Sequence, residues 1–85
     1  MYYLYILQSE KTGRFYIGQC ENVIIRYHQH ASGRVKSTKG RGPWEVAYWE
    51  AYDSRSGSVA RERYLKSLKS SVAIQQLIIE WEQTL

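Results

Sequence analysis

The sequence contains a single cysteine, Cys20, and only two histidines, His28 and His30, among 85 residues. One thiol cannot form an internal disulfide, which fits a reducing compartment such as the cytoplasm. Without a cysteine pair, a closed structural zinc site is not expected. No apolar run approaches the ~20 residues that a transmembrane helix needs, and no signal-peptide pattern is present. We therefore expect a single cytoplasmic domain, residues 1–85, with no membrane association.

Acidic residues are absent between Glu21 and Glu45, and the formal net charge of the chain is +4. The last fourteen residues differ, with Glu80 and Glu82 and no Lys or Arg. One end of the domain is therefore basic, which favours an anionic partner and nucleic acid above all. The cations of the acid-free segment are Arg26, Arg34, Lys36, Lys39 and Arg41.

The first half of the chain predicts a β-hairpin followed by a helix. Residues 2–7 and 15–19 are rich in β-branched and aromatic side chains, and Gly13 lies in the turn between them. A helix is expected over residues 23–30, with its cap within residues 20–22 and Gly33 as a stop signal. The residues expected on its buried side are Val23, Ile24, Ile25 and Tyr27.

The second half predicts one strand and two helices. Residues 44–52 alternate, with Trp44, Val46 and Tyr48 expected on one face of the strand. A helix capped by Ser56 or Ser58 is expected to reach about residue 69. A last helix over residues 72–82 is expected to bury Val72, Leu77, Ile78 and Trp81. The order ββαβαα predicts an α+β fold, a small sheet with helices packed on it.

Eight tyrosines are many for a chain of this length. Most are explained by a small core in which the ring is buried and the hydroxyl reaches water. Tyr5 and Tyr16 lie on the two arms of the expected hairpin, so they could face the same side. That arrangement would bring two phenolic hydroxyls together, and a phenol can accept or donate a proton.

Arg26 and His30 are four residues apart and therefore share one face of the expected helix. In one interpretation Arg26 extends to solvent and His30 stabilises the helix C-terminus. In the other they form a phosphate site with the tyrosines, because a guanidinium binds two phosphate oxygens at once. Spacing alone leaves both interpretations open.

Glu62 shares a helix stripe with Val59 and Leu65, so its carboxylate needs a partner. The simplest partner is Arg61, Arg63 or Lys66. A metal ion is the alternative, since one carboxylate with waters and a phosphate oxygen is typical of Mg²⁺.

The basic loop that follows the first helix contains four cations that favour contacts with a phosphate backbone. A solvated surface loop is the alternative. The expected nucleic-acid contacts are Arg34, Lys36, Lys39 and Arg41.

Taken together, these motifs resemble the GIY-YIG nuclease family, in particular its small single-domain bacterial members, over residues 2–78. The family's two tyrosine motifs match residues 3–5 and 16–18, eleven residues apart from Tyr5 to Tyr16. Its Arg-x-x-x-His helix matches Arg26 and His30, and its Thr-Lys-Gly-x-x-Pro-Trp loop matches residues 38–44. Its metal glutamate, in an Ala-x-Glu-x-x-x-Lys pattern, matches Glu62.

The resemblance implies a three-stranded antiparallel sheet flanked by helices, and an endonuclease that hydrolyses DNA phosphodiester bonds with Mg²⁺ or Mn²⁺. Family members act in intron homing, DNA repair, junction resolution and restriction. By position, Tyr5 or Tyr16 would activate or orient water, with His30 assisting. Arg26 would hold the scissile phosphate and Glu62 the metal. A free tyrosine has a pKa of about 10 and is a poor base at pH 7. We therefore expect the positive charges of Arg26 and a metal to lower the pKa of the catalytic tyrosine.

The chain departs from the family pattern in two places. Tyr3 and Leu4 replace the glycine and isoleucine of the first motif, and no Asn follows Asn22, although some family enzymes carry one on the last helix. The alternatives to a nuclease are a nucleic-acid-binding module with the same fold and a bare interaction scaffold. We expect DNA, duplex or branched, as the partner, and specificity from DNA structure or from a partner protein.

Overall fold

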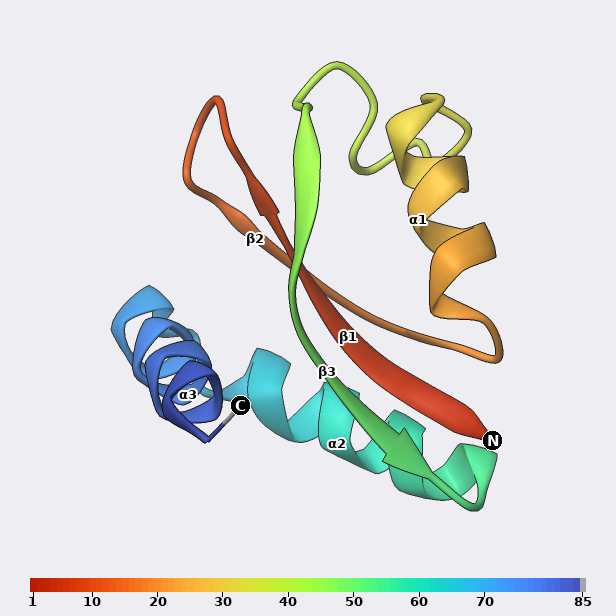
Figure 1. Ribbon diagram of the computed structural model, residues 1–85, viewed down its shortest axis with the longest axis vertical. Coiled ribbons are helices and arrows are strands. Elements are labelled where there is room, and N and C mark those ends of the chain that lie inside the picture. Colours follow the sequence, from red (N-terminus) through yellow and green to blue (C-terminus); the bar gives the residue numbers. More distant parts are fainter. Residues whose placement is uncertain (85) are drawn as a thin grey trace.

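The computed structural model describes residues 1–84, which form a three-stranded sheet and three helices (Figure 1). The strands are β1 (Tyr2–Ser9), β2 (Phe15–Cys20) and β3 (Trp44–Tyr52), paired antiparallel in the order β2-β1-β3. The predicted ββαβαα order and α+β class are confirmed. No helix among the described residues is long and apolar enough to cross a bilayer.

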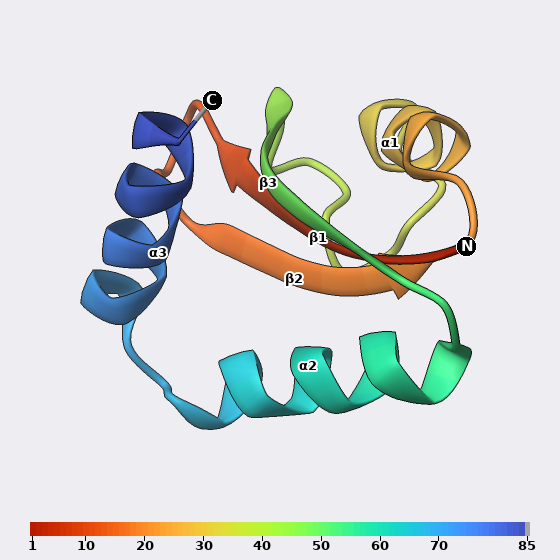
Figure 2. The same cartoon turned by 60° about the horizontal axis from the view of Figure 1, so that its bottom comes forward.

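The helices lie on both faces of the sheet. Figure 2 shows α1 (Val23–Ala31) over one face and α2 (Arg55–Ser67) beneath the other, with α3 (Ser71–Gln83) rising from the end of α2 and running across its direction. Each helix begins with a residue whose side-chain oxygen accepts a bond from a first-turn N–H. These caps are Asn22, Ser54 and Ser70. The expectation of a cap at Ser56 or Ser58 was therefore wrong by two or four residues, because Ser54 provides the same oxygen earlier.

The central strand β1 is buried on both faces, in keeping with its apolar sequence. Leu4 and Ile6 pack into the larger core with residues of α2 and α3, such as Leu65. Tyr5 and Leu7 point to the opposite face, where they pack against Trp44 and the side of α1. Alternation along a strand therefore divides its residues between a structural core and the face that carries α1.

The buried side of α1 is only partly the one that the sequence predicted, since Val23 and Tyr27 are half-buried but Ile24 and Ile25 are not. Ile24 and Ile25 are 71% and 57% exposed, whereas His30 is 2% exposed. Arg26 and Tyr27 are half-buried. The helix is thus oriented by the hydrogen-bonding partners available to Arg26 and His30 rather than by its most apolar side chains.

A β-bulge changes which residues of β3 share a face. The pairing with β1 shifts between Ile6 and Leu7, opposite Tyr48 and Val46, so that Ala47 has no partner. Trp44 consequently packs with Tyr5 and Tyr48 packs with Ile6, on opposite faces. The expectation that Trp44 and Tyr48 share a face was wrong, since an unpaired residue reverses the alternation.

The last helix also differs from its prediction at one position. Ile78 is buried and Leu77 and Trp81 are partly buried, as expected, but Val72 is 78% exposed. Ile74 occupies the place in the core that Val72 was expected to fill. Val72 lies in the first turn of α3, outside the core cluster to which Ile74 and Ile78 belong.

Helix α2 is fastened to β3 by a charged cluster around Glu50. The Glu50 carboxylate accepts hydrogen bonds from the hydroxyls of Tyr48 and Tyr52 and from Arg61, whose Nε lies 3.1 Å from it. Burial raises the pKa of Glu50, but these hydrogen bonds outweigh burial and hold the pKa below its usual value. The ionised form of Glu50 is therefore the one that fits the fold.

Glu50→Gln should destabilise the domain by about 2 kcal/mol, because it leaves the guanidinium of Arg61 half-buried without its anion. Thermal or urea unfolding at pH 7 measures the loss. The difference from the wild type should shrink as the pH falls below about 4, since protonation removes the same charge. Glu45→Gln, an exposed position in the same strand, is the control and should change stability by less than about 0.5 kcal/mol.

Candidate active site

The strand register brings Tyr5 and Tyr16 together on the face that carries α1. Tyr5 pairs with Gly18, and Leu7 pairs with Tyr16, so both tyrosine side chains point to the same side of the hairpin. Their ring centroids are 6.3 Å apart. The expectation that they share a side is confirmed.

A chain of hydrogen bonds leads from Tyr5 into the protein through His30. The Tyr5 hydroxyl lies 2.9 Å from Nε2 of His30, and Nδ1 of His30 lies 2.8 Å from Oγ1 of Thr38. Thr38 is 1% exposed, and its carbonyl accepts a bond from the indole N–H of Trp44 at 3.1 Å. His30 is thus held at both ring nitrogens, by a strand on one side and the basic loop on the other.

The hydrogen-bond directions in this chain indicate which nitrogen of His30 carries the proton. Thr38 donates its single hydroxyl proton to the carbonyl of Val35, at 3.3 Å, so its oxygen accepts from Nδ1–H. Nε2 is then free to accept the proton of the Tyr5 hydroxyl. Burial, together with the positive charge of Arg26, lowers the pKa of His30 to about 4. At neutral pH, His30 is therefore an uncharged acceptor.

Tyr5 itself keeps its proton. Burial raises its pKa to about 12, although the hydrogen bond from Arg26 acts in the opposite direction. The expectation that positive charge would lower the pKa of this tyrosine is therefore wrong for the protein alone, since desolvation of a phenolate outweighs one guanidinium. Tyr5 can donate its proton to His30 while it accepts another, but it does not persist as a phenolate.

Arg26 lies beside the Tyr5 hydroxyl with no carboxylate partner. Its Nε donates to Tyr5 at 3.3 Å, and its Nη1 donates to the side-chain oxygen of Gln29 at 2.9 Å. Among residues 1–84, no Asp or Glu forms an ion pair with Arg26. A half-buried guanidinium that meets only neutral acceptors retains its affinity for an anion.

Gly18 is a residue of this site that the sequence matched only as part of a motif, with no role given to it. A Cβ atom added to Gly18 would lie 2.5 Å from the Tyr5 hydroxyl oxygen and 2.6 Å from the ring carbon that bears it. The phenol of Tyr5 therefore lies across the backbone of β2 in space that only glycine leaves free. The signal was the glycine in the middle of an otherwise β-branched and aromatic strand.

Thr38 is the second such residue. It was noticed as part of a loop motif, but no role was given to it. Its burial in a loop whose charged neighbours are exposed, and its bond to His30, come from tertiary contacts that the local sequence does not encode.

Glu62 lies on α2, beneath the opposite face of the sheet from α1. It contacts none of Tyr5, Arg26 and His30 by a hydrogen bond within the described residues, and its ion pair is with Lys66, at 3.7 Å. It shares a helix stripe with Ser58, which bonds Gln19 of β2, and with Lys66, which adjoins Tyr16 at the edge of β2. Glu62 therefore faces the β2 edge, where the two faces of the sheet meet.

Glu62 offers one carboxylate, which is a ligand that a hard cation can use together with water and substrate oxygens. Among residues 1–84, no group of three or more His, Cys, Asp or Glu side chains is close enough to form a metal cage. A single carboxylate suits Mg²⁺, which retains several waters and uses phosphate oxygens as further ligands. The long distance to Lys66 leaves the Glu62 oxygens available.

The basic loop presents its charges outward from a fixed backbone. Arg34, Lys36, Lys39 and Arg41 are all exposed, and none forms an ion pair within the described residues. The backbone is held from within by Thr38 and by a 2.6 Å bond from the Ser9 hydroxyl to the Arg41 carbonyl. Free cations on a fixed loop adjoining Tyr5 and His30 are suited to grip a polyanion.

The neutral, Nδ1-protonated state of His30 is directly measurable. Ring ¹⁵N shifts should show Nδ1–H and a bare Nε2 from pH 5 to pH 8, with protonation only near pH 4. Thr38→Val should mix the two tautomers and destabilise the fold by about 1–2 kcal/mol, since it removes the acceptor for a buried N–H. A proton on Nε2 in the wild type would contradict this hydrogen-bond chain.

Comparison with known proteins supports the sequence resemblance. The GIY-YIG catalytic domain model matches residues 1–76. A UPF0213 protein of Clostridium perfringens is 34% identical over 76 residues, which cover 88% of this chain and 81% of that protein. The structure-specific endonuclease subunit SLX1 of Homo sapiens is 44% identical over 50 residues, which cover 54% of this chain and 18% of the human protein.

A solved structure shows the same architecture. The solution NMR structure of the UPF0213 protein of Bacillus halodurans matches this fold with a TM-score of 0.58 and 35% sequence identity. The match covers 92% of this chain and 83% of the other. The chain therefore belongs to the GIY-YIG family.

Proposed function

We propose that this domain is a divalent-metal-dependent endonuclease that hydrolyses phosphodiester bonds in DNA. One observation carries the proposal: the Tyr5 hydroxyl contacts both a neutral proton acceptor, His30, and a guanidinium without a carboxylate, Arg26. Phosphodiester hydrolysis needs these two functions at one point, removal of a proton from water and stabilisation of charge on phosphate oxygens.

Tyr5 acts as a proton relay in this proposal. Water attacks phosphorus, its proton passes to the Tyr5 oxygen, and the Tyr5 proton passes to Nε2 of His30. The new P–O bond replaces the bond to the leaving oxygen, which takes up a proton from solvent. The relay never requires a free phenolate, which agrees with a Tyr5 pKa of about 12. Tyr16, whose ring lies 4.7 Å from that of His30, is placed to orient the water.

Arg26 stabilises the transition state. Its Nε and Nη atoms form a planar fork beside the point of attack, where charge accumulates on the non-bridging oxygens. Glu62 is the residue that would hold Mg²⁺ or Mn²⁺, and the bound cation would neutralise further phosphate charge. The roles of Arg26 and Glu62 extend the family assignment to individual residues of this chain.

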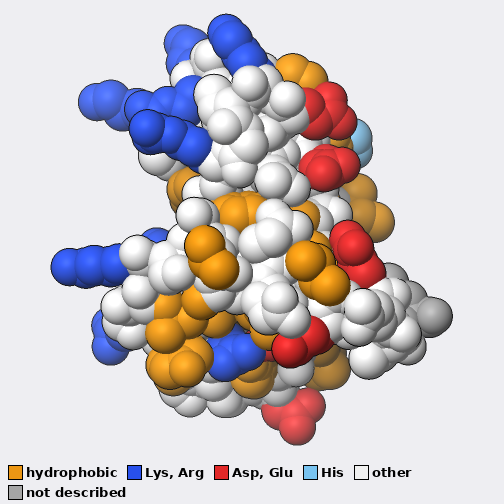
Figure 3. All heavy atoms as spheres, turned by 90° about the vertical axis from the view of Figure 1, so that its left-hand side faces the viewer, with side chains coloured by type: hydrophobic (Ala, Val, Ile, Leu, Met, Phe, Trp, Pro, Cys, Tyr) orange, Lys and Arg blue, Asp and Glu red, His pale blue; other side chains and the backbone are white. Residues whose placement is uncertain are grey.

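The Lys and Arg side chains along one edge of the domain would bind the DNA backbone. Figure 3 shows Lys and Arg side chains along one edge of the molecule and Asp and Glu side chains along the other. The human relative is named a subunit of a structure-specific endonuclease. We extend this to branched DNA as the substrate here, and to a partner protein as a source of specificity.

Glu62→Gln should abolish cleavage while it leaves the fold and DNA binding intact. The amide keeps the size of the side chain but removes the charge that a hard cation needs. The lost pair with Lys66 is long, at 3.7 Å, and its lysine is exposed, so its loss should cost less than about 0.5 kcal/mol. Cleavage of duplex, flap, branched and single-stranded DNA is assayed with Mg²⁺, Mn²⁺ or EDTA, beside melting temperature and DNA affinity.

Glu82→Gln, at an exposed position of α3, is the matched control and should cut normally. A Glu62→Gln protein that melts lower but cuts normally would show that Glu62 only pairs with its neighbours. A wild-type protein that binds DNA but cuts none of the substrates with either metal would instead favour the binding module.

Replacing Arg34, Lys36, Lys39 and Arg41 by Ala should weaken DNA binding and reduce its salt dependence. Each lost phosphate contact lowers the slope of log K against log salt by ~0.9 on duplex DNA, so the four together remove about 3.6. Fluorescence anisotropy between 50 and 200 mM salt gives the slope. An unchanged affinity and slope would make the loop a solvated surface. Arg55→Ala/Arg63→Ala, on α2, is the control.

A further inference from the structure

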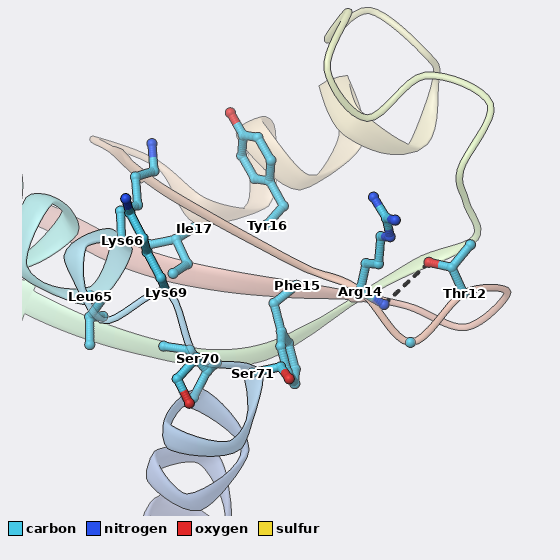
Figure 4. Close-up of a pocket in the computed structure, with 12 residues that line it drawn as sticks. Thr12, Arg14, Phe15, Tyr16, Ile17, Leu65, Lys66, Lys69, Ser70 and Ser71 are labelled. Carbon is cyan, nitrogen blue, oxygen red and sulfur yellow. Dashed lines mark hydrogen bonds between the residues drawn. The ribbon is translucent and has the colours of Figure 1, made fainter.

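A cleft of about 600 Å³ opens between the β1–β2 hairpin and the junction of α2 with α3 (Figure 4). Tyr16 lies at its inner side, with Arg14 on one flank and Lys66 and Lys69 on the other. The side chains of Lys66 and Lys69 extend toward the side to which the Tyr16 hydroxyl points (Figure 4). The cleft and the candidate active site therefore share a wall, because Tyr16 belongs to both.

The charge of the cleft is of one sign. Three cations line it, and no Asp or Glu is among its described lining residues. Arg14 and Lys69 form no ion pair within residues 1–84, and Lys66 has only the 3.7 Å contact with Glu62. Cations that converge on a concave surface without counter-charges raise the local concentration of anions.

The backbone at Lys69 adds a second argument. Lys69 has φ = 48°, in the left-handed region that costs a residue with a side chain roughly 1 kcal/mol and that Gly or Asn adopts more readily. This conformation turns the chain from α2 into α3 and leaves the lysine on the rim of the cleft. The N-terminus of α3, at Ser70 and Ser71, opens onto the same space and adds its positive dipole end.

We propose that this cleft binds a phosphate of the substrate strand, next along the strand from the scissile phosphate. The proposal rests on the proposed function, since it takes the scissile phosphate to lie at Tyr5 and Arg26. The basic loop and the cleft would then hold the strand at two points with Tyr16 between them. A strand fixed at two points is oriented as well as bound. This orientation would keep the scissile bond aligned with the hydroxyl of Tyr5.

The test compares Arg14→Gln/Lys69→Gln with Arg55→Gln/Arg63→Gln. Both variants remove two positive charges, the second pair from exposed positions of α2 outside the cleft. Affinity for fluorescent duplex and single-stranded DNA is measured in EDTA between 50 and 200 mM salt, so that the readout does not require cleavage. Neither Arg14 nor Lys69 has an ion pair whose loss would expose a carboxylate.

The cleft variant should lose its contact with one phosphate. Its slope of log K against log salt should fall by ~0.9 on duplex or ~0.7 on single-stranded DNA, and its affinity at 0.1 M salt by about tenfold. The control should retain the wild-type slope. Equal losses in both variants would overturn the proposal, because net charge rather than the cleft would then explain them.

Two further results separate the cleft from the proposed function. In the first, the wild type cuts DNA and the variant that lacks the four cations of the basic loop loses DNA affinity, but the cleft variant binds DNA like the wild type. Only the cleft proposal then fails. Inorganic phosphate is then titrated against the amide signals of Ser70 and Ser71. Saturation by phosphate with unchanged DNA affinity would assign the cleft to a free anion and overturn the proposal. If no variant alters DNA binding and the wild type does not cut, the proposed function itself has failed.

Discussion

The position of the Tyr5 phenol is the constraint on which the rest of the site depends. Its ring lies across the backbone of Gly18, and its hydroxyl ends between His30 and Arg26. That position orients α1, because the helix must direct Arg26 and His30 rather than Ile24 and Ile25 toward the sheet. It also fastens the basic loop, since Nδ1, the other ring nitrogen of His30, is hydrogen-bonded to the Thr38 hydroxyl.

The two faces of the sheet contribute different functions. The face under α1 carries the proposed proton relay and the guanidinium of Arg26, whereas α2 carries Glu62 and Lys66 on the other side. The edge strand β2 is where they can meet, because it pairs only with β1 and its far edge is not covered by another strand. Arg61, next to Glu62 in the chain, is held to β3 by Glu50, so the stability of that buried cluster also fixes the side chains that face the edge.

The sequence predicted the order of elements and the fold class because both follow from local patterns. Gly13 marks the turn, residues 20–22 contain the cap, and β-branched and aromatic side chains mark β1. The wrong predictions arose from tertiary contacts. The bulge at Ala47 reversed the faces of β3, and the polar side of α1 was buried because Tyr5 and Thr38 offer hydrogen-bond partners there. Gly18 was matched as part of a motif but given no role, because its role depends on a tyrosine thirteen residues earlier.

In the proposed mechanism the negative charge comes from the substrate phosphate, and this explains why the protein can bury Tyr5 and His30. The fold encloses His30 as a neutral base and Tyr5 as a neutral phenol, so neither incurs the cost of a buried charge. The one charged group at their side, Arg26, is only half-buried and keeps contact with solvent until an anion arrives. A phosphate would then supply the missing counter-charge and exclude water in the same step, which strengthens the Arg26 interaction where the reaction needs it.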